Sequence, residues 1–446
     1  MGTICAISTA YGTGGIAVIR VSGPEAITIA DSLFRGRTRL CDAPGGSVHF
    51  GRICKGLADG EVLDEVLCSV FRSPHSFTGE DTVEIACHGS LYIQQEMLGW
   101  LIDAGCRAAE PGEFTRRAFL NGKMDLTQAE AVADLIASQS KAEKDLALSH
   151  LRGAVSTELQ GLRDRLLHFT SLIELELDFA DHEELEFADR SELNGLAEEI
   201  ETKLASLLAS FRTGNAIRHG IPVAIVGAPN VGKSTLLNAL LGEQRAIVSD
   251  IQGTTRDTIE DTLVIDGILF RLIDTAGLRE TSDTLENMGI ERSRKAAEQA
   301  QIIVYVSDGE AFPQPLPEGR GVVISVRNKS DLLGDGVSLQ GETNGSRLLI
   351  SAKYGQIEPL KKELVRVARE TMQTSAVMLS NARHYEAISR GHEAIIRVQE
   401  GLNNGLSGEL LSLDLQDCLA ALGEVTGQIT NQEVLTNIFS KFCIGK

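Results

Sequence analysis

The sequence predicts a multi-domain α/β protein in which a P-loop domain is inserted between two helical segments. Three observations predict this fold class. A buried-type strand at 223–226 leads through a glycine-rich loop into a helical run, and short β-branched runs fill residues 3–118. Long helical periodicity appears both before and after the P-loop region. Helical segments on both sides of an α/β region predict one discontinuous helical domain with an insertion.

Length and composition fit several globular domains. The 446 residues leave room for three domains at roughly 150 residues each. Hydrophobic residues make up 43% and charged residues 23% of the chain, which is ordinary for a protein with a sizeable core. The net charge of −20 argues against broad, charge-driven coating of nucleic acid, although a local basic patch could still bind it.

The cysteines and the start of the chain indicate a cytoplasmic protein. The eight cysteines are scattered, with no CxxC pair and no Cys/His spacing suited to zinc, which favours a reducing compartment. The opening "MGTICAISTA" lacks the basic and apolar regions of a signal peptide. No apolar run approaches the ~18 residues needed to cross a bilayer.

Residues 1–118 are predicted to form an N-terminal α/β domain, with strands at "GIAVIRVSG" and "TVEIACHG" and a helix near 91–104. Within it, "GTGGIA" at 12–17 fits a dinucleotide-binding fingerprint. A β-branched strand follows where that fold requires a helix, so we reject this interpretation. His88 and Cys87 are neighbours in a predicted strand and should face opposite sides, which argues against a thiol–imidazole pair.

Residues 119–213 and 376–446 are predicted to form the helical domain. Its apolar stripes include Leu159, Leu162, Leu166 and Ile173 in the first part and Leu411, Leu415, Leu419 and Leu422 in the second. "RTGNAIRHGIP" at 212–222 has the composition of a linker. The acidic stretch at 174–187 is predicted to be a solvated helix end or loop rather than a multi-metal site.

Residues 214–375 carry the strongest motif, the P-loop GxxxxGK[ST] at Gly227–Ser234. The glycines allow backbone N–H groups to surround phosphates, and the helix that follows adds favourable dipole charge. We expect Lys233 to reach the β- and γ-phosphates and to act in catalysis, and Ser234 to ligate Mg²⁺.

Four further segments follow at the distances expected of a Ras-like G domain: "GTTRD" (253–257), "DTAG" (274–277), "NKSD" (328–331) and "SAK" (351–353). Thr255 is a second candidate Mg²⁺ ligand, and the Asp331 carboxylate can accept two hydrogen bonds from guanine, which selects GTP. The predicted GTP-binding residues are Asn230, Val231, Gly232, Lys233, Ser234, Thr235, Asp274, Thr275, Ala276, Gly277, Asn328, Lys329, Asp331, Ser351, Ala352 and Lys353.

The residue that positions the attacking water is not defined by these motifs. Leu278 stands after "DTAG", where Ras-like proteins carry a glutamine, and leucine cannot orient a water. Another group must do so, and the transition state needs an additional cation. The downstream candidates are Arg279, Glu280, Asp283 and Glu286, and their spacing does not choose among them.

Taken together, these motifs resemble the MnmE (TrmE) family of tRNA-modification GTPases over essentially the whole chain. The resemblance rests on "GIAVIRVSGP", "SFTGEDTVEIACHG", "PGEFTRRAFLNGKMDLTQAEA", "GAPNVGKST", "GTTRDT", "DTAGLRE" and the terminal "FCIGK". The GTPase motifs alone fit many relatives, whereas the N-terminal runs and the tail are more specific. The family architecture is an N-terminal folate-binding domain that dimerises, a helical domain of two segments and an inserted G domain.

For the GTPase reaction, the resemblance implies potassium activation. K⁺ would act where other GTPases use an arginine. The ion would be bound by Asn230, Ser249, Ile251 and Thr254. Glu286 would orient the attacking water through a second water. The family acts as a homodimer with an FAD-containing MnmG-type partner in a hetero-tetramer. Together they install an aminomethyl or carboxymethylaminomethyl group on carbon five of the wobble uridine of certain tRNAs.

The resemblance also implies a folate site. A tetrahydrofolate, in the formyl or methylene form, would supply the one-carbon unit and contact Arg20, Glu84, Lys123 and Lys446. The tail "CIGK" ends in lysine and is a poor prenylation signal, so we place it at the folate pocket instead. Cys443 is then either a catalytic group or a structural thiol, and both interpretations stay open.

Two other functions were weighed against this one. A ribosome-assembly GTPase usually has an added RNA-binding module or a second G domain, but only one P-loop occurs here. A nucleotide-gated scaffold without turnover is disfavoured by the presence of Lys233, Ser234, Thr255 and Asp274.

Overall fold

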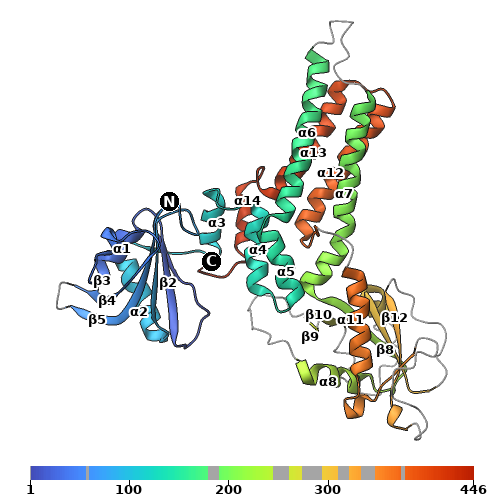
Figure 1. Cartoon of the computed structure of the whole chain (residues 1–446), viewed down its shortest axis with the longest axis horizontal. Helices are drawn as coiled ribbons and strands as arrows, with labels where there is room; N and C mark the ends of the chain where they lie inside the picture. Colours follow the sequence, from blue (N-terminus) through green and yellow to red (C-terminus); the bar gives the residue numbers. More distant parts are fainter. Residues whose placement is uncertain are drawn as a thin grey trace. The chain divides into compact units, whose positions relative to one another are not determined.

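The computed structural model describes residues 2–56, 60–178, 190–244, 261–273, 294–309, 321–332, 347–372 and 377–445. The chain divides into two compact units, which are described separately (Figure 1). Unit 1 comprises Met1–Ala133 with Gly423–Lys446, and unit 2 comprises Asp134–Leu422. In the described part of the chain, no helix has both the length and the apolar character required to cross a membrane.

Unit 1 is built on a seven-stranded sheet with the order β3-β4-β5-β6-β2-β1-β7. β1 pairs in parallel with β7, and the remaining neighbours are antiparallel. The strands are β1 (Ile4–Ile7), β2 (Ile16–Ser22), β3 (Phe34–Gly36), β4 (Ser47–Lys55), β5 (Glu61–Phe71), β6 (Thr82–His88) and β7 (Arg107–Ala108). The predicted strands at 15–23 and 82–89 are therefore confirmed.

Helices α1 (Ala26–Leu33) and α2 (Leu91–Asp103) share one hydrophobic core with this sheet. Ile85 of β6, together with Met97 and Trp100 of α2, is buried there. Side chains alternate along β6, so Cys87 faces the core while His88 is exposed and bonds Asp64. The predicted separation of Cys87 from His88 is thus confirmed, as is the helix near 91–104.

Three further helices complete unit 1: α3 (Glu113–Leu120), the start of α4 (Leu126–Ala137) and α14 (Gln432–Phe439). Leu126 of α4 and Phe439 of α14 are buried together with Phe442 of the tail. The last helix of the chain is therefore packed within the unit that holds the first strand. The predicted boundaries of the helical domain, 119–213 and 376–446, stay a prediction.

The helices of unit 2 are α5 (Lys141–Leu151), α6 (Ala154–Asp178), α7 (Arg190–His219), α12 (Ala382–Asn403) and most of α13 (Gly408–Thr426). α7 packs along α12 (Figure 1). Most residues of the predicted stripes are buried, including Leu159, Leu162 and Leu166 in α6 and Leu411, Leu415 and Leu422 in α13, whereas Leu419 is half-buried. The acidic stretch at 174–187 lies mostly outside the described residues.

The predicted linker at 212–222 is wrong, because most of it is the last part of α7, which runs to His219 and leads into β8. Gly214 lies within this part of α7. A Cβ at this position would lie 2.1 Å from the carbonyl oxygen of Leu379. Glycine is required here because another segment of backbone passes close to the helix.

The remainder of unit 2 is a six-stranded sheet with the order β13-β12-β11-β8-β10-β9, in which β9 alone is antiparallel to its neighbour. Its strands are β8 (Ile221–Gly227), β9 (Asp261–Ile265), β10 (Ile268–Ile273), β11 (Ile302–Ser307), β12 (Val322–Arg327) and β13 (Arg347–Leu349). Because the parallel strands end at one edge, the loops that follow them meet there.

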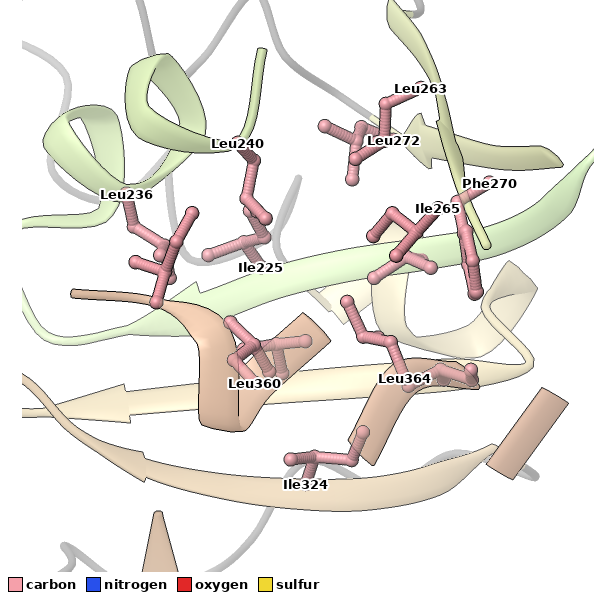
Figure 2. Packing of buried hydrophobic residues seen from close by; sticks show 14 of the residues in the cluster. Ile225, Leu236, Leu240, Leu263, Ile265, Phe270, Leu272, Ile324, Leu360 and Leu364 are labelled. Carbon is pink, nitrogen blue, oxygen red and sulfur yellow. The ribbon is translucent and has the colours of Figure 1, made fainter. Parts of the chain in front are cut away.

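Helices α8 (Lys233–Gln244) and α11 (Glu358–Met372) pack on this sheet. Figure 2 shows Leu236 and Leu240 of α8 and Leu360 of α11 around Ile225 of β8, which makes the core continuous beneath the P-loop. Short 3₁₀ turns occur at Leu40–Asp42, Ser330–Leu332 and Ala352–Tyr354.

Candidate functional site

The P-loop connects the end of β8 at Gly227 to the start of α8 at Lys233, as the motif predicts. Asn230 and Gly232 have positive φ values of 63° and 94°, which turn the backbone sharply at this point. A Cβ on Gly232 would lie 2.3 Å from Nδ2 of Asn328. Gly232 is therefore needed both for the turn and for the contact with the next loop.

Lys233 folds back over the P-loop. Its ammonium group donates to the carbonyl oxygens of Gly227 and Ala228, each at 2.7 Å. Burial lowers the pKa of Lys233, because removal from water disfavours the charged form. Ser234 follows at the start of α8 and is half-buried, and Thr235 is exposed. The cation thus lies directly over the loop whose N–H groups would surround a phosphate.

Asn328 ties three loops of the site together. Its Nδ2 donates to the Val231 carbonyl at 2.9 Å, and its Oδ1 accepts from the Ala352 N–H at 3.0 Å. The side chain is 3% exposed. The motif predicted a nucleotide contact, whereas the structure gives Asn328 the additional role of fixing the P-loop against the "SAK" turn.

The neighbouring residues that the motifs predict to contact the base also hold one another in position. Ser351 Oγ donates to Asp331 Oδ1 at 2.6 Å, and Asp331 is exposed, so its carboxylate is held in place with a face open to solvent. The Lys329 ammonium bonds the Asn230 carbonyl at 2.9 Å and Asp308 at 2.7 Å. Lys353 lies over the Tyr354 ring. Asp308 was not predicted from the sequence, and its position directly after β11 is the signal that could have identified it.

The other predicted GTPase residues lie outside the described residues: Ser249, Ile251, Thr254, Thr255, Asp274, Thr275, Ala276, Gly277 and Glu286. The described part of this region ends with β10 at Ile273, which pairs in parallel with β8. Among the described residues, no group of three or more His, Cys, Asp or Glu side chains forms a metal site.

In unit 1, the structure brings together Arg20, Glu84 and the end of the chain. Arg20 and Glu84 are cross-strand neighbours on β2 and β6, and their side chains pair at 2.8 Å. Arg20 also donates to the Gly445 carbonyl at 3.5 Å, and the rings of Phe77 and Phe114 flank its guanidinium. A carboxylate, a cation and two aromatic rings are thus gathered at one place, which we call the tail pocket.

The tail is held in the pocket by its backbone. Gly445 has a φ of 94°, and a Cβ there would lie 2.3 Å from the carbonyl oxygen of Ile7. Ser8 Oγ donates to the Gly445 carbonyl at 3.2 Å, and the Gly112 N–H donates to the Cys443 carbonyl. The Cys443 side chain is exposed, and Lys446 lies outside the described residues.

Lys123, the remaining predicted folate residue, has a different partner. Its ammonium donates to the carbonyl oxygen of Pro74 at 2.9 Å, and its stem lies against Gly79. In the described contacts it therefore belongs to the loop at 73–81 rather than to the Arg20–Glu84 pair.

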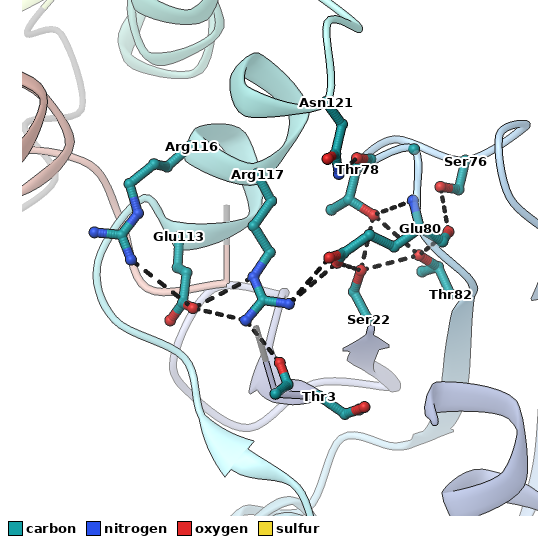
Figure 3. A network of polar contacts seen from close by, with 12 residues as sticks. Thr3, Ser22, Ser76, Thr78, Glu80, Thr82, Glu113, Arg116, Arg117 and Asn121 are labelled. Atoms are coloured by element: carbon teal, nitrogen blue, oxygen red, sulfur yellow. Dashed lines mark hydrogen bonds and ion pairs between the residues drawn. The ribbon is translucent and has the colours of Figure 1, made fainter. Parts of the chain in front are cut away.

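A buried polar network supports that loop, and the sequence motifs did not identify it (Figure 3). Arg117 of α3 lies between Glu113 and Glu80, with contacts of 2.9 Å and 3.1 Å. Ser22 links Glu80 to Thr78. The i, i+4 spacing of Glu113 and Arg117 within "PGEFTRRAF" was the available signal.

Glu113 is the most strongly perturbed carboxylate of this network. Burial alone would raise the pKa of Glu113, but hydrogen bonds from Arg107, the Glu110 N–H and Arg117 outweigh it and lower the pKa to about 2. The side chain is only 2% exposed and is ionised at neutral pH. The network fixes α3 beside the start of the chain, because Arg117 also donates to the Gly2 carbonyl.

Family models match both the N-terminal region of the chain and the region that follows it. A family model of the MnmE helical domain matches residues 126–443, and a model of the TrmE N-terminus, described as a GTP-binding protein, matches residues 3–123. A solved structure of Era from Aquifex aeolicus, bound to GDP.AlF4-, aligns at 25% identity over 39% of this chain and 66% of that chain. Its TM-score of 0.24 is too low to establish a shared fold.

Curated relatives match along the whole chain. A tRNA modification GTPase MnmE from Parabacteroides distasonis is 55% identical over 100% of both chains. Proteins of the same name from Bacteroides fragilis and Porphyromonas gingivalis are 52% and 50% identical, over 100% of this chain and 99% and 98% of theirs. The chain belongs to the MnmE family.

Proposed function

We propose that this chain is a K⁺-activated GTP hydrolase that takes part in tRNA modification. The observation that carries the proposal is the set of contacts joining the P-loop, Asn328 and the Ser351–Asp331 pair. These contacts support the proposal because they hold the P-loop near the Asp331 carboxylate, in a chain that belongs to the MnmE family.

Among the described residues, the P-loop and the Asp331 region support GTP binding, and Ser234 is one of the two proposed Mg²⁺ ligands. The Lys233 ammonium already lies over the P-loop, and a small side-chain rotation would exchange its two carbonyl partners for phosphate oxygens. Ser234 and Thr255 would hold Mg²⁺, which neutralises charge on the phosphates when bound. The open face of Asp331 would accept the guanine N–H groups, and Ser351 would keep it in that orientation.

For the chemical step, we propose that K⁺ binds to Asn230, Ser249, Ile251 and Thr254 and that Glu286 orients the attacking water. Asn230 fits this role, because it is exposed at a positive-φ position of the P-loop. K⁺ would supply positive charge to the transition state, and Glu286 would take over the orientation of water that Leu278 cannot provide.

The test is hydrolysis measured in matched K⁺ and Na⁺ salts. We expect a steep rise with K⁺ only, and near-complete loss of turnover in Glu286→Ala with GTP binding retained. Equal rates in both salts would reject the potassium site, and full turnover in the variant would reject the role of Glu286.

We further propose that a tetrahydrofolate, in the formyl or methylene form, binds at the tail pocket. Glu84 would accept from the N–H groups of a pterin ring, and Arg20 and Lys446 would meet the anionic part of the ligand. Lys123 would have to exchange its Pro74 partner to join them. The Arg20 and Glu84 side chains are 13% and 30% exposed, so they are positioned yet accessible. Cys443 would act there as nucleophile or acid–base group, or serve only in structure.

Folate binding by calorimetry tests this site. Glu84→Gln should weaken binding, whereas Asp103→Asn, which breaks an exposed ion pair with Lys55 in the same unit, should not. If the two variants bind folate alike, the pocket is misassigned. Cys443→Ser distinguishes the two roles of the thiol. Loss of tRNA modification with an unchanged GTPase rate would show that the thiol is catalytic.

The proposed product is a (carboxymethyl)aminomethyl group on carbon five of the wobble uridine of certain tRNAs. It would be made in the cytoplasm by a homodimer acting with an FAD-containing MnmG-type partner in a hetero-tetramer. Self-association is supported by exposed apolar side chains on strands of one sheet, namely Ile16, Val48 and Leu67. Nucleoside analysis of tRNA from cells that lack the gene tests the assignment, and an unaltered wobble uridine would overturn it.

A further inference from the structure

Unit 1 contains an open cleft that none of the proposed functions uses. The cleft has a volume of about 810 Å³ and is lined by the end of α1, by β3 and the residues after it, and by β4. Four of its ten lining residues are arginines: Arg35, Arg37, Arg39 and Arg52. We call it the arginine cleft. Asp31 is its one acidic lining residue, so the cleft is basic although the chain carries a net charge of −20.

Two of the four positive charges are not balanced by a carboxylate. Arg35 donates to the main-chain carbonyls of Ser32, Phe34 and Gly56, so it is fixed in place with its charge uncompensated. Arg37 is exposed, and no hydrogen bond or ion pair joins its side chain to another described residue. An incoming anion would therefore meet available positive charge.

The other two arginines are held in position by acidic neighbours. Arg39 donates through Nε and Nη2 to Asp31, which is itself buried and accepts from the Leu40 N–H. Arg52 pairs with Glu65 at 3.1 Å. Both guanidinium groups remain more than half exposed, at 72% and 59%. Each has further N–H groups for a ligand, because an arginine carries five donors.

The strand pairing places like charges together. Arg35 and Arg52 are directly opposite each other on β3 and β4, where like charges repel, and Glu65 offsets the charge of Arg52 only. The next pair is Gly36 and Gly51, where a Cβ would lie 2.5 Å from the Phe34 ring in both cases. Glycine at both positions makes room for the Phe34 ring, which lies across the two strands.

Protection of the sheet edge does not account for the cluster. β3 is the edge strand, and charged residues there prevent pairing with other chains (Figure 1). Of the four arginines, only Arg35 lies on β3, whereas Arg37 and Arg39 follow it and Arg52 lies on β4. The four arginines therefore line the cleft and do not follow the edge strand.

We propose that the arginine cleft binds the phosphate backbone of the tRNA substrate, an inference that rests on the proposed function. Arginine forks match phosphate geometry, and contacts to phosphate position a nucleic acid without reading its sequence. The volume is in the range of ligand sites in proteins. RNA binding through such a local site is compatible with the acidic charge of the whole chain.

The test is binding of unmodified tRNA to the full chain at several salt concentrations, with Arg37→Gln as the main variant. Loss of one phosphate contact should reduce the salt slope by about 0.9 and weaken binding by on the order of eightfold at 0.1 M salt. Arg37 has no partner to lose, so folding should be unaffected. Arg152→Gln, at an exposed arginine of unit 2 whose side chain likewise has no partner among the described contacts, is the matched control. Arg37→Lys should restore most of the affinity.

The outcomes separate this inference from the proposed function. A wild-type salt slope in Arg37→Gln overturns the cleft as an RNA site while leaving the tRNA substrate intact. Absence of tRNA binding by the wild-type chain at any salt overturns both. If Arg37→Gln abolishes binding of free pyrophosphate but leaves tRNA affinity unchanged, the cleft is a site for a small anion and not for RNA. Rates of GTP hydrolysis should be the same in all three variants.

Discussion

The nucleotide site and the tail pocket are assembled in different ways. The nucleotide site is made of loops that follow successive strands of one parallel sheet, so its topology brings them to one edge. The tail pocket joins Arg20 to Gly445, which are 425 positions apart in the chain. The first site depends on local motifs on a rigid sheet, and the second depends on a chain end held by a few backbone contacts.

The largest effect is expected at the nucleotide site, from Lys233→Ala. The variant removes the ammonium group that bonds the P-loop carbonyls of Gly227 and Ala228, so GTP hydrolysis should fall by about 10²–10³-fold, the usual cost of losing a preorganised electrostatic group. Steady-state phosphate release measures the change. Lys362→Ala, at an exposed lysine of α11, is the control. Folate binding should be unaltered, and a parallel loss at the tail pocket would mean that the two sites are not independent.

The next effect concerns acid stability of unit 1. Glu113 has a pKa lowered from 4.5 to about 2, so its ionised form is stabilised in the folded state. This contribution, at most about 3 kcal/mol, is fully present above pH ~4.5 and is lost as the pH falls toward 2. Trp100, the single tryptophan of the chain, is buried in unit 1 and reports its unfolding by fluorescence.

Glu113→Gln provides the control for that measurement. It removes the titrating group, so unit 1 should be less stable at pH 7 and should lose less stability between pH 4.5 and pH 2 than the wild type. An identical acid dependence in both proteins would show that Glu113 does not contribute to it.

A smaller effect is expected from Gly445→Ala in the tail pocket. The added Cβ would approach the Ile7 carbonyl at a positive-φ position, with a strain of about 1–3 kcal/mol. The tail is held by few contacts and should detach, which would weaken folate binding about tenfold or more with little change in global unfolding. Gly405→Ala has a similar φ of 68° and no atom within 4 Å, so it separates backbone strain from the clash. Unchanged folate affinity in Gly445→Ala would exclude the tail from the site.

The difference between local motifs and contacts of residues distant in the chain explains which features the sequence could predict. The P-loop, the strands before "NKSD" and "SAK", and the apolar stripes of α6 and α13 follow from local patterns, and the structure contains them. The 212–222 segment was misread because Gly214 reflects a contact with Leu379, which is distant in sequence. The Glu113–Arg117–Glu80 network and the position of the tail also depend on long-range contacts. Only the resemblance to a family indicated where the tail lies.

The smallest effect is expected at Glu143, a buried carboxylate of unit 2. Its pKa is shifted in the opposite direction to that of Glu113 in unit 1. Burial raises the pKa of Glu143 in α5, against hydrogen bonds from Gln139 and Ser140 that lower it. One oxygen accepts from the Gln139 N–H, whereas Oε1 is buried without a partner among the described residues. The ionised form is thus disfavoured in the folded state, so Glu143 reduces stability above its folded pKa and ceases to do so as the pH falls below it.

Glu143→Gln should therefore stabilise unit 2 at pH 7 by up to about 1 kcal/mol, because glutamine retains the acceptor for the Gln139 N–H without a buried charge. The gain should vanish in acid, where the wild-type carboxyl is protonated, and this is the reverse of the trend at Glu113. Hydrogen exchange of α5 amides measures it. Asp145→Asn in the same helix removes an exposed carboxylate and should give no such gain. Destabilisation by Glu143→Gln at every pH would show instead that the charge of Glu143 supports α5.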